Sequence, residues 1–172
     1  MRELEVRSND YNLQEGWQIA AISYAEFGQW NVVKYIDVYF EGLPETLNLR
    51  IYETVNSQTG KEFAIGNLFR FANAGIVEVQ TNGDSKHVRI NDDPTVLSSK
   101  KLNIFLYREG SRYFRILSRV APAEWFENEL EIMSPDSIEY WKDRADWYYK
   151  QYVELSLESQ LKLRARRSDD YS

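Results

Sequence analysis

Very few residues of this chain are of the types that catalyse reactions or bind metals. The 172 residues include one histidine, His87, and no cysteine. Cysteine nucleophiles, thiolate zinc sites, histidine-based triads and multi-histidine metal sites are therefore excluded. His87 follows the turn-like "TNGDS", and no nucleophile that it could activate stands nearby in the sequence. We expect it to be a solvated residue of a hairpin.

Carboxylates offer the remaining catalytic option. Asp92 and Asp93 of "NDDP" could hold a divalent cation together with Asp37 or Glu53. Acidic residues before a proline are more simply explained by a turn. The chain has no Walker phosphate loop, no GxGxxG, no HExxH and no nuclease-like acidic motif. We therefore expect no enzyme, no metal and no cofactor.

Aromatic side chains are the abundant chemical resource of this sequence. They make up 15% of the chain and include 12 tyrosines, which can be half-buried and still offer a ring and a hydroxyl to a partner. The formal charge of −6 argues against attraction of the whole molecule to a polyanion. The segment from Lys100 to Arg119 is nevertheless rich in Lys and Arg and contains a single Glu. A local basic groove therefore remains compatible with the composition.

Alternating segments predict the strands that carry these aromatic residues. A first strand is expected in "GWQIAAISYAEF", followed by a turn that leaves Phe27 and Trp30 at a loop tip. Two further strands, in "YIDVYFEG" and "LNLRIYETVN", alternate cleanly and predict a hairpin with an aliphatic inner row. Its outer row contains Tyr35, Asp37, Tyr39, Asn48, Arg50 and Tyr52.

The rest of the chain predicts a helix, a second hairpin and a long C-terminal helix. "KEFAIGNLFRFANAG" has helical periodicity, "IVEV", "HVRI" and "TVLSS" are short β-like pieces, and "KKLNIFLYR" and "RYFRILSRV" form a hairpin. Ser134 and Pro135 then start a long amphipathic helix. The expected divisions are a polar lead-in (1–15), a β domain (16–121), a helical or acidic connector (122–134), the helix (135–167) and a disordered acidic tail (168–172).

Three strands, a helix and two more strands follow the order of an OB-fold. This fold is a five-stranded, partly open barrel with a helix between strands 3 and 4. We therefore expect a mainly β protein of the α+β class, made of an OB-like five-stranded barrel and the long C-terminal amphipathic helix. OB-folds bind oligonucleotides on the face of strands 2 and 3, where the tyrosine row of this chain falls.

Residues 16–120 resemble a family of phage-encoded, OB-like proteins associated with recombination and replication genes. The resemblance lies in "EGWQIAAISYAEF", "YIDVYFEG", "LNLRIYETVN", "FAIGNLFRFANAGI" and "LSSKKLNIFLYREGSRYFRI". It is a likeness of pattern, and the long C-terminal helix is not part of it. It implies a viral protein that binds single-stranded DNA without catalysis.

Binding of single strands requires rings on which bases stack and cations that follow the phosphates. The first hairpin and its loop supply both kinds of residue, and the second hairpin adds basic groups interleaved with rings. The predicted nucleic-acid-binding residues are Phe27, Trp30, Lys34, Tyr35, Tyr39, Arg50, Tyr52, Lys100, Lys101, Tyr107, Arg108, Tyr113 and Arg115. The alternatives are that these tyrosines pack beneath the C-terminal helix or are scattered surface residues.

The C-terminal helix carries an apolar stripe at three- and four-residue spacing. The stripe could pack on the barrel of its own chain or form a homo-oligomer. The stripe residues, our candidates for an oligomer interface, are Ile138, Trp141, Ala145, Tyr148, Tyr152 and Leu155. The basic end "KLRARR" suits the negative pole of the helix dipole, or could act as an arm on nucleic acid.

The sequence thus leaves two functions open. The first is a single-stranded DNA-binding protein, and the second is a protein-interaction factor, such as a viral inhibitor or assembly protein, that uses the aromatic face or the helix. No apolar run is long enough to span a membrane, and the N-terminus lacks the apolar core of a signal peptide. We therefore expect no membrane partner and a location in the cytoplasm, of the host cell if the protein is viral.

Overall fold

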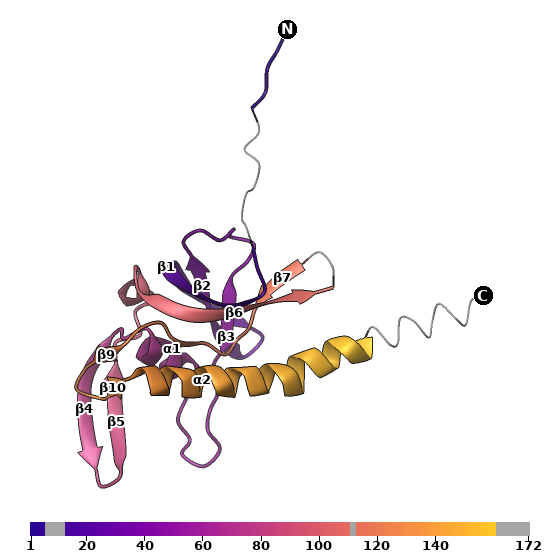
Figure 1. Ribbon diagram of the computed structural model, residues 1–172. Coiled ribbons are helices and arrows are strands. Elements are labelled where there is room, and N and C mark those ends of the chain that lie inside the picture. Colours follow the sequence, from indigo (N-terminus) through magenta and orange to yellow (C-terminus); the bar gives the residue numbers. More distant parts are fainter. Residues whose placement is uncertain (6–12, 111–112, 161–172) are drawn as a thin grey trace.

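The computed structural model describes residues 1–5, 13–110 and 113–160. Its main element is a curved antiparallel sheet with the strand order β3-β2-β1-β6-β7 (Figure 1). A short strand, β8, also pairs with β6. The strands of this sheet are β1 (Gly16–Trp30), β2 (Val33–Phe40), β3 (Leu49–Tyr52), β6 (Lys101–Glu109), β7 (Tyr113–Ile116) and β8 (Ala121–Pro122).

The length of β1 allows it to serve both halves of the sheet. Residues Gly16 to Ala21 pair with β6, and residues from Ile22 onward pair with β2. The register shifts between Ile22 and Tyr24, and such a bulge bends a strand and increases its twist. The two predicted hairpins, β2–β3 and β6–β7, are confirmed, but the described residues show no pairing between β3 and β7. The sheet is therefore not a closed barrel.

The hydrophobic core lies on the concave side of this sheet. The predicted aliphatic rows of the first hairpin are buried, including Ile36, Val38 and Leu49, which have no exposed surface. Helix α1 (Ala64–Phe71) fills the end of the core with Leu68 and Phe69. Alternate residues of β6 complete it, because Leu102, Ile104 and Leu106 are fully buried.

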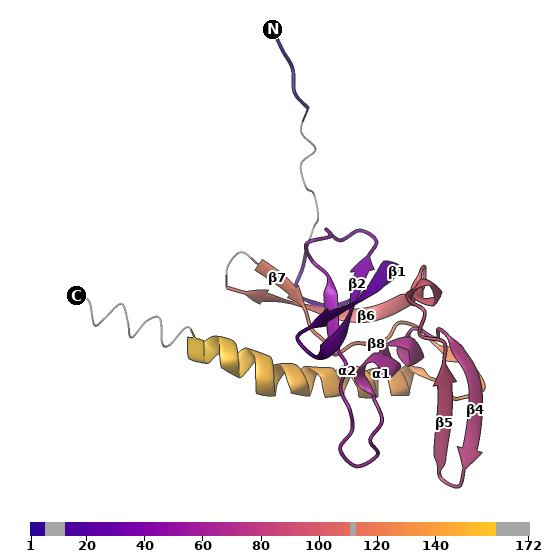
Figure 2. The ribbon, with the colours of Figure 1, turned by 180° about the vertical axis from the view of Figure 1, so that it is seen from behind.

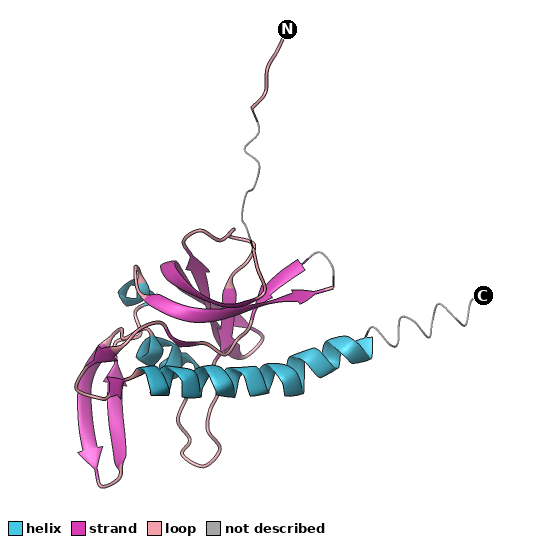
Figure 3. Ribbon diagram, viewed as in Figure 1, coloured by secondary structure: helices cyan, strands magenta, loops and turns pink. Residues whose placement is uncertain are grey.

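Two smaller β elements stand apart from the main sheet. Strands β4 (Ile76–Asn82) and β5 (Ser85–Ile90) form a hairpin that projects from the body of the molecule (Figures 1 and 3). Strands β9 (Phe126–Glu127) and β10 (Ile132–Met133) lie in the connector, where we expected a helix or an irregular segment. The prediction of a β-like segment in "TVLSS" is wrong. Its first three residues belong to a 3-10 helix, η1 (Pro94–Leu97), and the Asp93 carboxylate caps this helix by accepting a hydrogen bond from the Thr95 N–H.

The long C-terminal helix is present. Helix α2 (Pro135–Tyr148) starts after Ser134, whose hydroxyl accepts a hydrogen bond from the Ser137 N–H. It continues through a π-helical segment, η2 (Tyr149–Glu154), and stays helical to residue 160. The expected continuation to residue 167, with "KLRARR", and the tail 168–172 lie outside the described residues.

Helix α2 crosses the sheet and then extends past it. Figures 1 and 2 show it running along the side of the sheet near α1, with its C-terminal end beyond β7. Its first turns contact α1, where Trp141 packs against Phe71 with 4.8 Å between ring centroids. Within the part of the chain that the structure describes, no helix is long and apolar enough to cross a membrane.

Candidate functional site

An aromatic surface covers the convex face of β1, β2 and β3. Directly paired residues share a face of an antiparallel sheet, and the register pairs Tyr24 with Tyr39, Gly28 with Tyr35, and Tyr35 with Tyr52. Trp30 continues the same row at the end of β1 and is 64% exposed. We call this surface the tyrosine wall: it consists of Tyr24, Trp30, Tyr35, Tyr39 and Tyr52.

Two rings of the wall form a parallel stack. The ring centroids of Tyr24 and Tyr39 lie 4.4 Å apart with 12° between their planes. The Tyr39 hydroxyl donates a hydrogen bond of 3.4 Å to a carboxylate oxygen of Glu26. Partial burial, followed by neighbouring carboxylates, raises the pKa of both tyrosines, so their hydroxyls stay neutral. The stack is a flat, uncharged surface.

Tyr35 is held rigidly at the centre of the wall. A Cβ atom at Gly28 would lie 2.4 Å from the Tyr35 ring, so only glycine leaves room for the ring there. The guanidinium of Arg50 lies 3.9 Å from the centroid of the ring, and Tyr52 meets it edge-on at 5.7 Å. Stacked guanidinium and ring pairs are attractive. The ring is therefore fixed by its neighbours.

Arg50 is committed to a carboxylate within the protein. Its Nε and Nη2 donate hydrogen bonds of 2.7 and 2.9 Å to the two carboxylate oxygens of Asp37. These bonds are the main reason why the pKa of Arg50 is raised. Asp37, an outward residue by pattern, is only 6% exposed because Arg50 covers it. Arg50 thus contributes shape and a polar rim to the wall more than a free positive charge.

Two residues predicted to lie with the wall belong to the opposite face. Phe27 pairs with Ile36, and Lys34 pairs with Gln29. Both side chains therefore point to the face of the hairpin opposite the tyrosine wall. Lys34 therefore supplies no cation next to Tyr35 and Tyr39, although both residues remain exposed at the hairpin tip. The prediction that Phe27 and Trp30 lie at a loop tip is wrong, because β1 continues to Trp30.

The second hairpin is where the C-terminal helix docks. Tyr149 contacts Phe105 and Tyr107 of β6 at centroid distances of 5.0 and 5.3 Å. The indole N–H of Trp17 donates a hydrogen bond of 3.0 Å to Asp146. Burial raises the pKa of Tyr107. Tyr107 therefore packs with part of its ring against the helix and also lines a groove beside it, and its role as a nucleic-acid contact stays a prediction.

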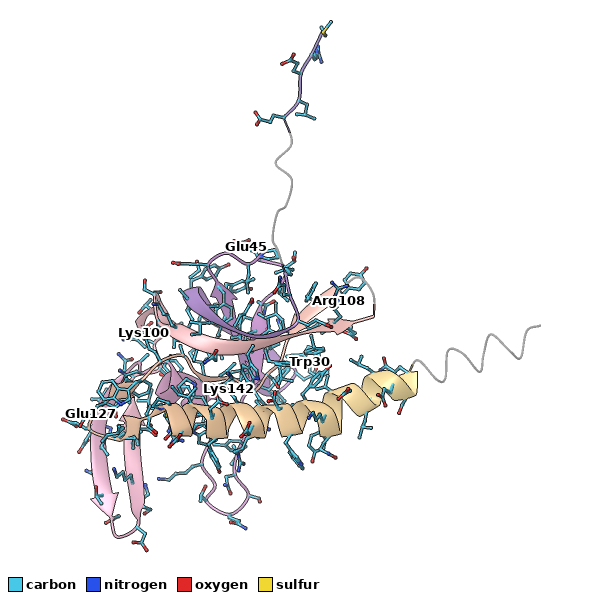
Figure 4. All side chains as sticks on the ribbon, in the orientation of Figure 1. Trp30, Glu45, Lys100, Arg108, Glu127 and Lys142 are labelled. Carbon is cyan, nitrogen blue, oxygen red and sulfur yellow. The ribbon has the colours of Figure 1, made fainter. Side chains whose placement is uncertain are left out.

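The basic residues of the second hairpin do not form one cluster. Lys100 and Lys101 stand at the start of β6 and Arg108 near its end, eight residues away, or about 26 Å at about 3.3 Å per residue. Figure 4 shows Lys100 and Arg108 at opposite ends of the strand. Arg115 is paired with the carboxylate of Glu109, and Tyr113 is exposed beside it. The local excess of cations in the sequence is thus dispersed or neutralised in space.

A large groove follows the seam between β3 and β7. It has a volume of about 1580 Å³ and is bounded on one side by the last turns of the C-terminal helix. Arg50, Tyr52 and Tyr113 line it, so it continues the edge of the tyrosine wall. Among the described residues, its charged lining consists of Glu15, Glu109, Glu154 and Glu158 with Arg50, Arg108 and Arg115. Because Arg50 and Arg115 are paired with carboxylates, this seam groove is not basic.

The stripe proposed as an oligomer interface is largely used within the chain. Ala145 is buried, and Ile138 and Trp141 pack against the core. Tyr148 lies under the guanidinium of Arg119, 4.6 Å from its ring centroid. Four of the six stripe residues thus make contacts within their own chain, which contradicts their prediction as an oligomer interface. Tyr152 and Leu155 remain exposed, at 60% and 51%.

Sequence reasoning missed one ring of the wall and two residues beside it. Tyr24, Glu26 and Gly28 lie in the first strand at two-residue spacing and reach the same face as Trp30. The period of two was available in the sequence "YAEFGQW", and a glycine opposite a tyrosine is a known sign of close packing. Gly28 was missed because the first strand was predicted to end before it, whereas Tyr24 and Glu26 lay within the predicted strand and were not assigned to a face.

The candidate chemical residues lie in structural roles. Asp93 accepts hydrogen bonds from the N–H and hydroxyl of Thr95, which lower its pKa, and Asp37 binds Arg50. His87 is exposed, with its Nδ1 3.0 Å from Nζ of Lys61. Within residues 1–5, 13–110 and 113–160, no three Asp, Glu or His side chains are grouped so that they could hold a metal ion.

No protein-family model, curated protein or solved structure matches the chain.

Proposed function

We propose that this protein binds single-stranded DNA without catalysis and that the bases stack on the tyrosine wall. One observation carries the proposal: the helix docks on β6 and α1, and the wall stays open to solvent. Stacking of a base on an aromatic ring contributes about 1 to 3 kcal/mol and tolerates any sequence, because every base has a flat face. The Tyr24 and Tyr39 stack and the exposed Trp30 offer such faces.

The strand order supports an OB-like architecture for the binding domain. In an OB-fold the first strand pairs with the second and the fourth, and a helix precedes the fourth. The order β3-β2-β1-β6-β7, with α1 between β3 and β6, has this connectivity, with the β4–β5 hairpin as an insertion. The tyrosine wall then occupies the face of strands 2 and 3 where OB-folds hold oligonucleotides. The proposed barrel is open along the seam between β3 and β7.

The charges around the wall shape the expected binding mode. Glu26 and Asp37 lie within the wall, Glu45 is close to Tyr24, and Arg50 is already paired. Phosphates therefore gain little there, and stacking must supply most of the affinity. For single strands the salt slope is about −0.7 for each phosphate neutralised. We expect a slope near −1, shallower than that of a strongly basic binding protein.

The resemblance to phage-encoded proteins supports a role in replication or recombination of viral DNA in the host cytoplasm. Single strands are intermediates in both processes. A binding protein without an enzymatic site would protect or present them.

A protein-interaction factor is the second candidate. The acidic residues beside the wall and in the seam groove favour it, because they repel a polyanion and suit a basic or aromatic protein segment. The two candidates share one surface and differ in partner.

Fluorescence anisotropy separates the two. Labelled single-stranded and double-stranded oligonucleotides of equal sequence are titrated with the protein across a salt series. The DNA-binding proposal predicts tighter binding of the single strand, with a shallow salt dependence. Absence of binding at low salt, or equal binding of the duplex, would contradict it and favour a protein partner.

A further inference from the structure

A small crevice opens between α1, α2 and the segment that follows β7. Its floor is apolar and includes Ile51, Leu68 and Ala145, and its volume is about 60 Å³. Since a water molecule takes up about 30 Å³ in the liquid, the crevice holds about two waters or one small tetrahedral anion. Asn67, Ser118, Arg119 and Arg144 give it its polar lining.

The two arginines differ from most others in the folded body. Four arginines bind carboxylates of this chain: Arg50, Arg70, Arg89 and Arg115. Neither Arg119 nor Arg144 has a carboxylate oxygen within 4.0 Å among the described residues. Both therefore keep their positive charge available at the crevice.

Aromatic rings of α2 hold both guanidiniums in place. The Arg119 guanidinium lies 4.6 Å from the centroid of the Tyr148 ring. The Arg144 guanidinium lies 5.6 and 5.7 Å from the rings of Tyr140 and Trp141, and its Nη1 donates a hydrogen bond of 3.2 Å to the Tyr140 hydroxyl. A ring restrains a guanidinium without neutralising it. The cations are thus pre-positioned with N–H donors to spare.

The crevice and the seam groove both border β3 but lie on opposite faces of it, because successive residues of a strand point to opposite faces. Arg50 and Tyr52 of β3 line the groove, and Ile51 between them lines the crevice. On the other side, Ile116 of β7 lines the groove and Ser118 lines the crevice.

We propose that Arg119 and Arg144 form a phosphate-binding site, with Asn67 and Ser118 as additional hydrogen-bond donors. Two guanidiniums offer planar N–H pairs that match phosphate oxygens. The expected ligand is a backbone phosphate of the single strand, and this assignment rests on the proposed function. A free phosphate or a small phosphorylated compound carries the same chemistry and would fit the same crevice.

The test has two arms. In the first, pyrophosphate is added to the full chain and the arginine Nε–H resonances are followed by NMR. Shifts of Arg119 and Arg144 are expected, while Arg70 and Arg89, which are held by carboxylates, stay in place. Equal small shifts of all arginines, or none, would overturn the site.

In the second arm, the labelled single strand is titrated with the double variant Arg119→Gln/Arg144→Gln. Its affinity at low salt should fall about tenfold, and the salt slope should become shallower by about 0.7, the value for loss of one phosphate contact. Arg89→Gln, which removes a cation from the projecting hairpin, is the matched control and should leave the slope unchanged. Arg119→Lys/Arg144→Lys keeps the charges and should lie between the wild type and the Gln variant, which covers the case in which the Gln variant folds poorly.

The outcomes separate the site from the function. If pyrophosphate shifts the two arginine resonances but the protein binds no oligonucleotide, the crevice is a site for a small phosphorylated ligand. That result would contradict the proposed function. Oligonucleotide binding that the double variant leaves unchanged would retain the function and overturn the crevice as a backbone site.

Discussion

The guanidinium of Arg50 binds the carboxylate of Asp37 through two hydrogen bonds, of 2.7 and 2.9 Å, in the middle of the tyrosine wall. The two residues are direct neighbours on β2 and β3. Their ion pair ties the two strands together, and the same guanidinium stacks on Tyr35. The pair thus stabilises the hairpin and fixes the shape of the binding face at once.

Removal of Arg50 should destabilise the fold. Arg50→Gln removes the two hydrogen bonds and the charge that pair with Asp37, and loss of the partner of a largely buried charge costs about 1 to 3 kcal/mol in a partly exposed site. The free energy of unfolding in urea measures the effect. Arg89→Gln removes the exposed ion pair with Glu78, and such a pair contributes at most about 1 kcal/mol. Equal losses in the two variants would show that the Arg50 pair has no special role.

Substitution of Gly28 should displace Tyr35. In Gly28→Ala the new methyl group lies within 2.5 Å of ring atoms, so the ring must move off the strand and away from Arg50. Such overpacking costs about 1 to 3 kcal/mol, and the near-ultraviolet circular dichroism should change.

Gly66→Ala is the matched control. Its Cβ would come no closer than 3.8 Å to a carboxylate oxygen of Glu62, and the residue lies within α1. Because alanine favours helices over glycine by about 1 kcal/mol, this variant should be as stable as the wild type or more so. A stable Gly28→Ala protein with an unchanged spectrum would contradict the packing of Tyr35.

The docking of α2 predicts different roles for two tryptophans of the same helix. Trp141 packs against Phe71, so Trp141→Ala should lower the free energy of unfolding by about 2 to 4 kcal/mol. Trp147 is 58% exposed, and Trp147→Ala should change it by less than about 0.5 kcal/mol. Similar effects of the two substitutions would mean that the helix does not dock on its own chain as described.

Stability should fall at alkaline pH because of Tyr107. Burial raises its pKa above the ordinary value of 10.0. Between pH 10 and the raised pKa the unfolded chain loses this proton first, so the unfolded state gains stability relative to the native state. The contribution of Tyr107 to the free energy of unfolding should therefore be constant below about pH 9 and decline above pH 10. Tyr107→Phe should weaken this decline, and an identical profile in both proteins would exclude the buried hydroxyl as a cause.

Local patterns in the sequence predicted the elements but not their docking. The alternation around Ile36 and Val38 and the cap at Ser134 depend on neighbours within a few residues, and both were predicted correctly. The contact between Trp17 and Asp146 joins residues 129 positions apart, and no local pattern contains it. Tyr39 and Tyr107 look alike in sequence, as outward tyrosines of alternating strands. Both are partly buried, but Tyr39 stacks on Tyr24 of the same sheet, whereas Tyr107 packs against Tyr149 of the C-terminal helix, a contact that depends on the path of that helix.

The partners of the cations were also beyond local patterns. Asp37 and Arg50 lie on the same face of the predicted hairpin, but their pairing depends on the register that the loop between β2 and β3 sets. Lys34 shows how one step in the alternation moves a side chain to the other face. The basic stretch from Lys100 to Arg115 is a cluster in sequence, whereas an extended strand separates its ends.

The tyrosine wall as a stacking surface is tested most directly by the affinity of a wall variant for single-stranded DNA. Tyr24→Leu/Tyr39→Leu removes the stacked rings and keeps apolar side chains at both positions, and Trp125→Leu, at an exposed residue between β8 and β9, is the control. Loss of one to two stacking contacts predicts at least about tenfold weaker binding of a labelled oligonucleotide by the wall variant, at unchanged thermal stability, with the control equal to the wild type. Equal affinity of the folded wall variant and the wild type would contradict the account.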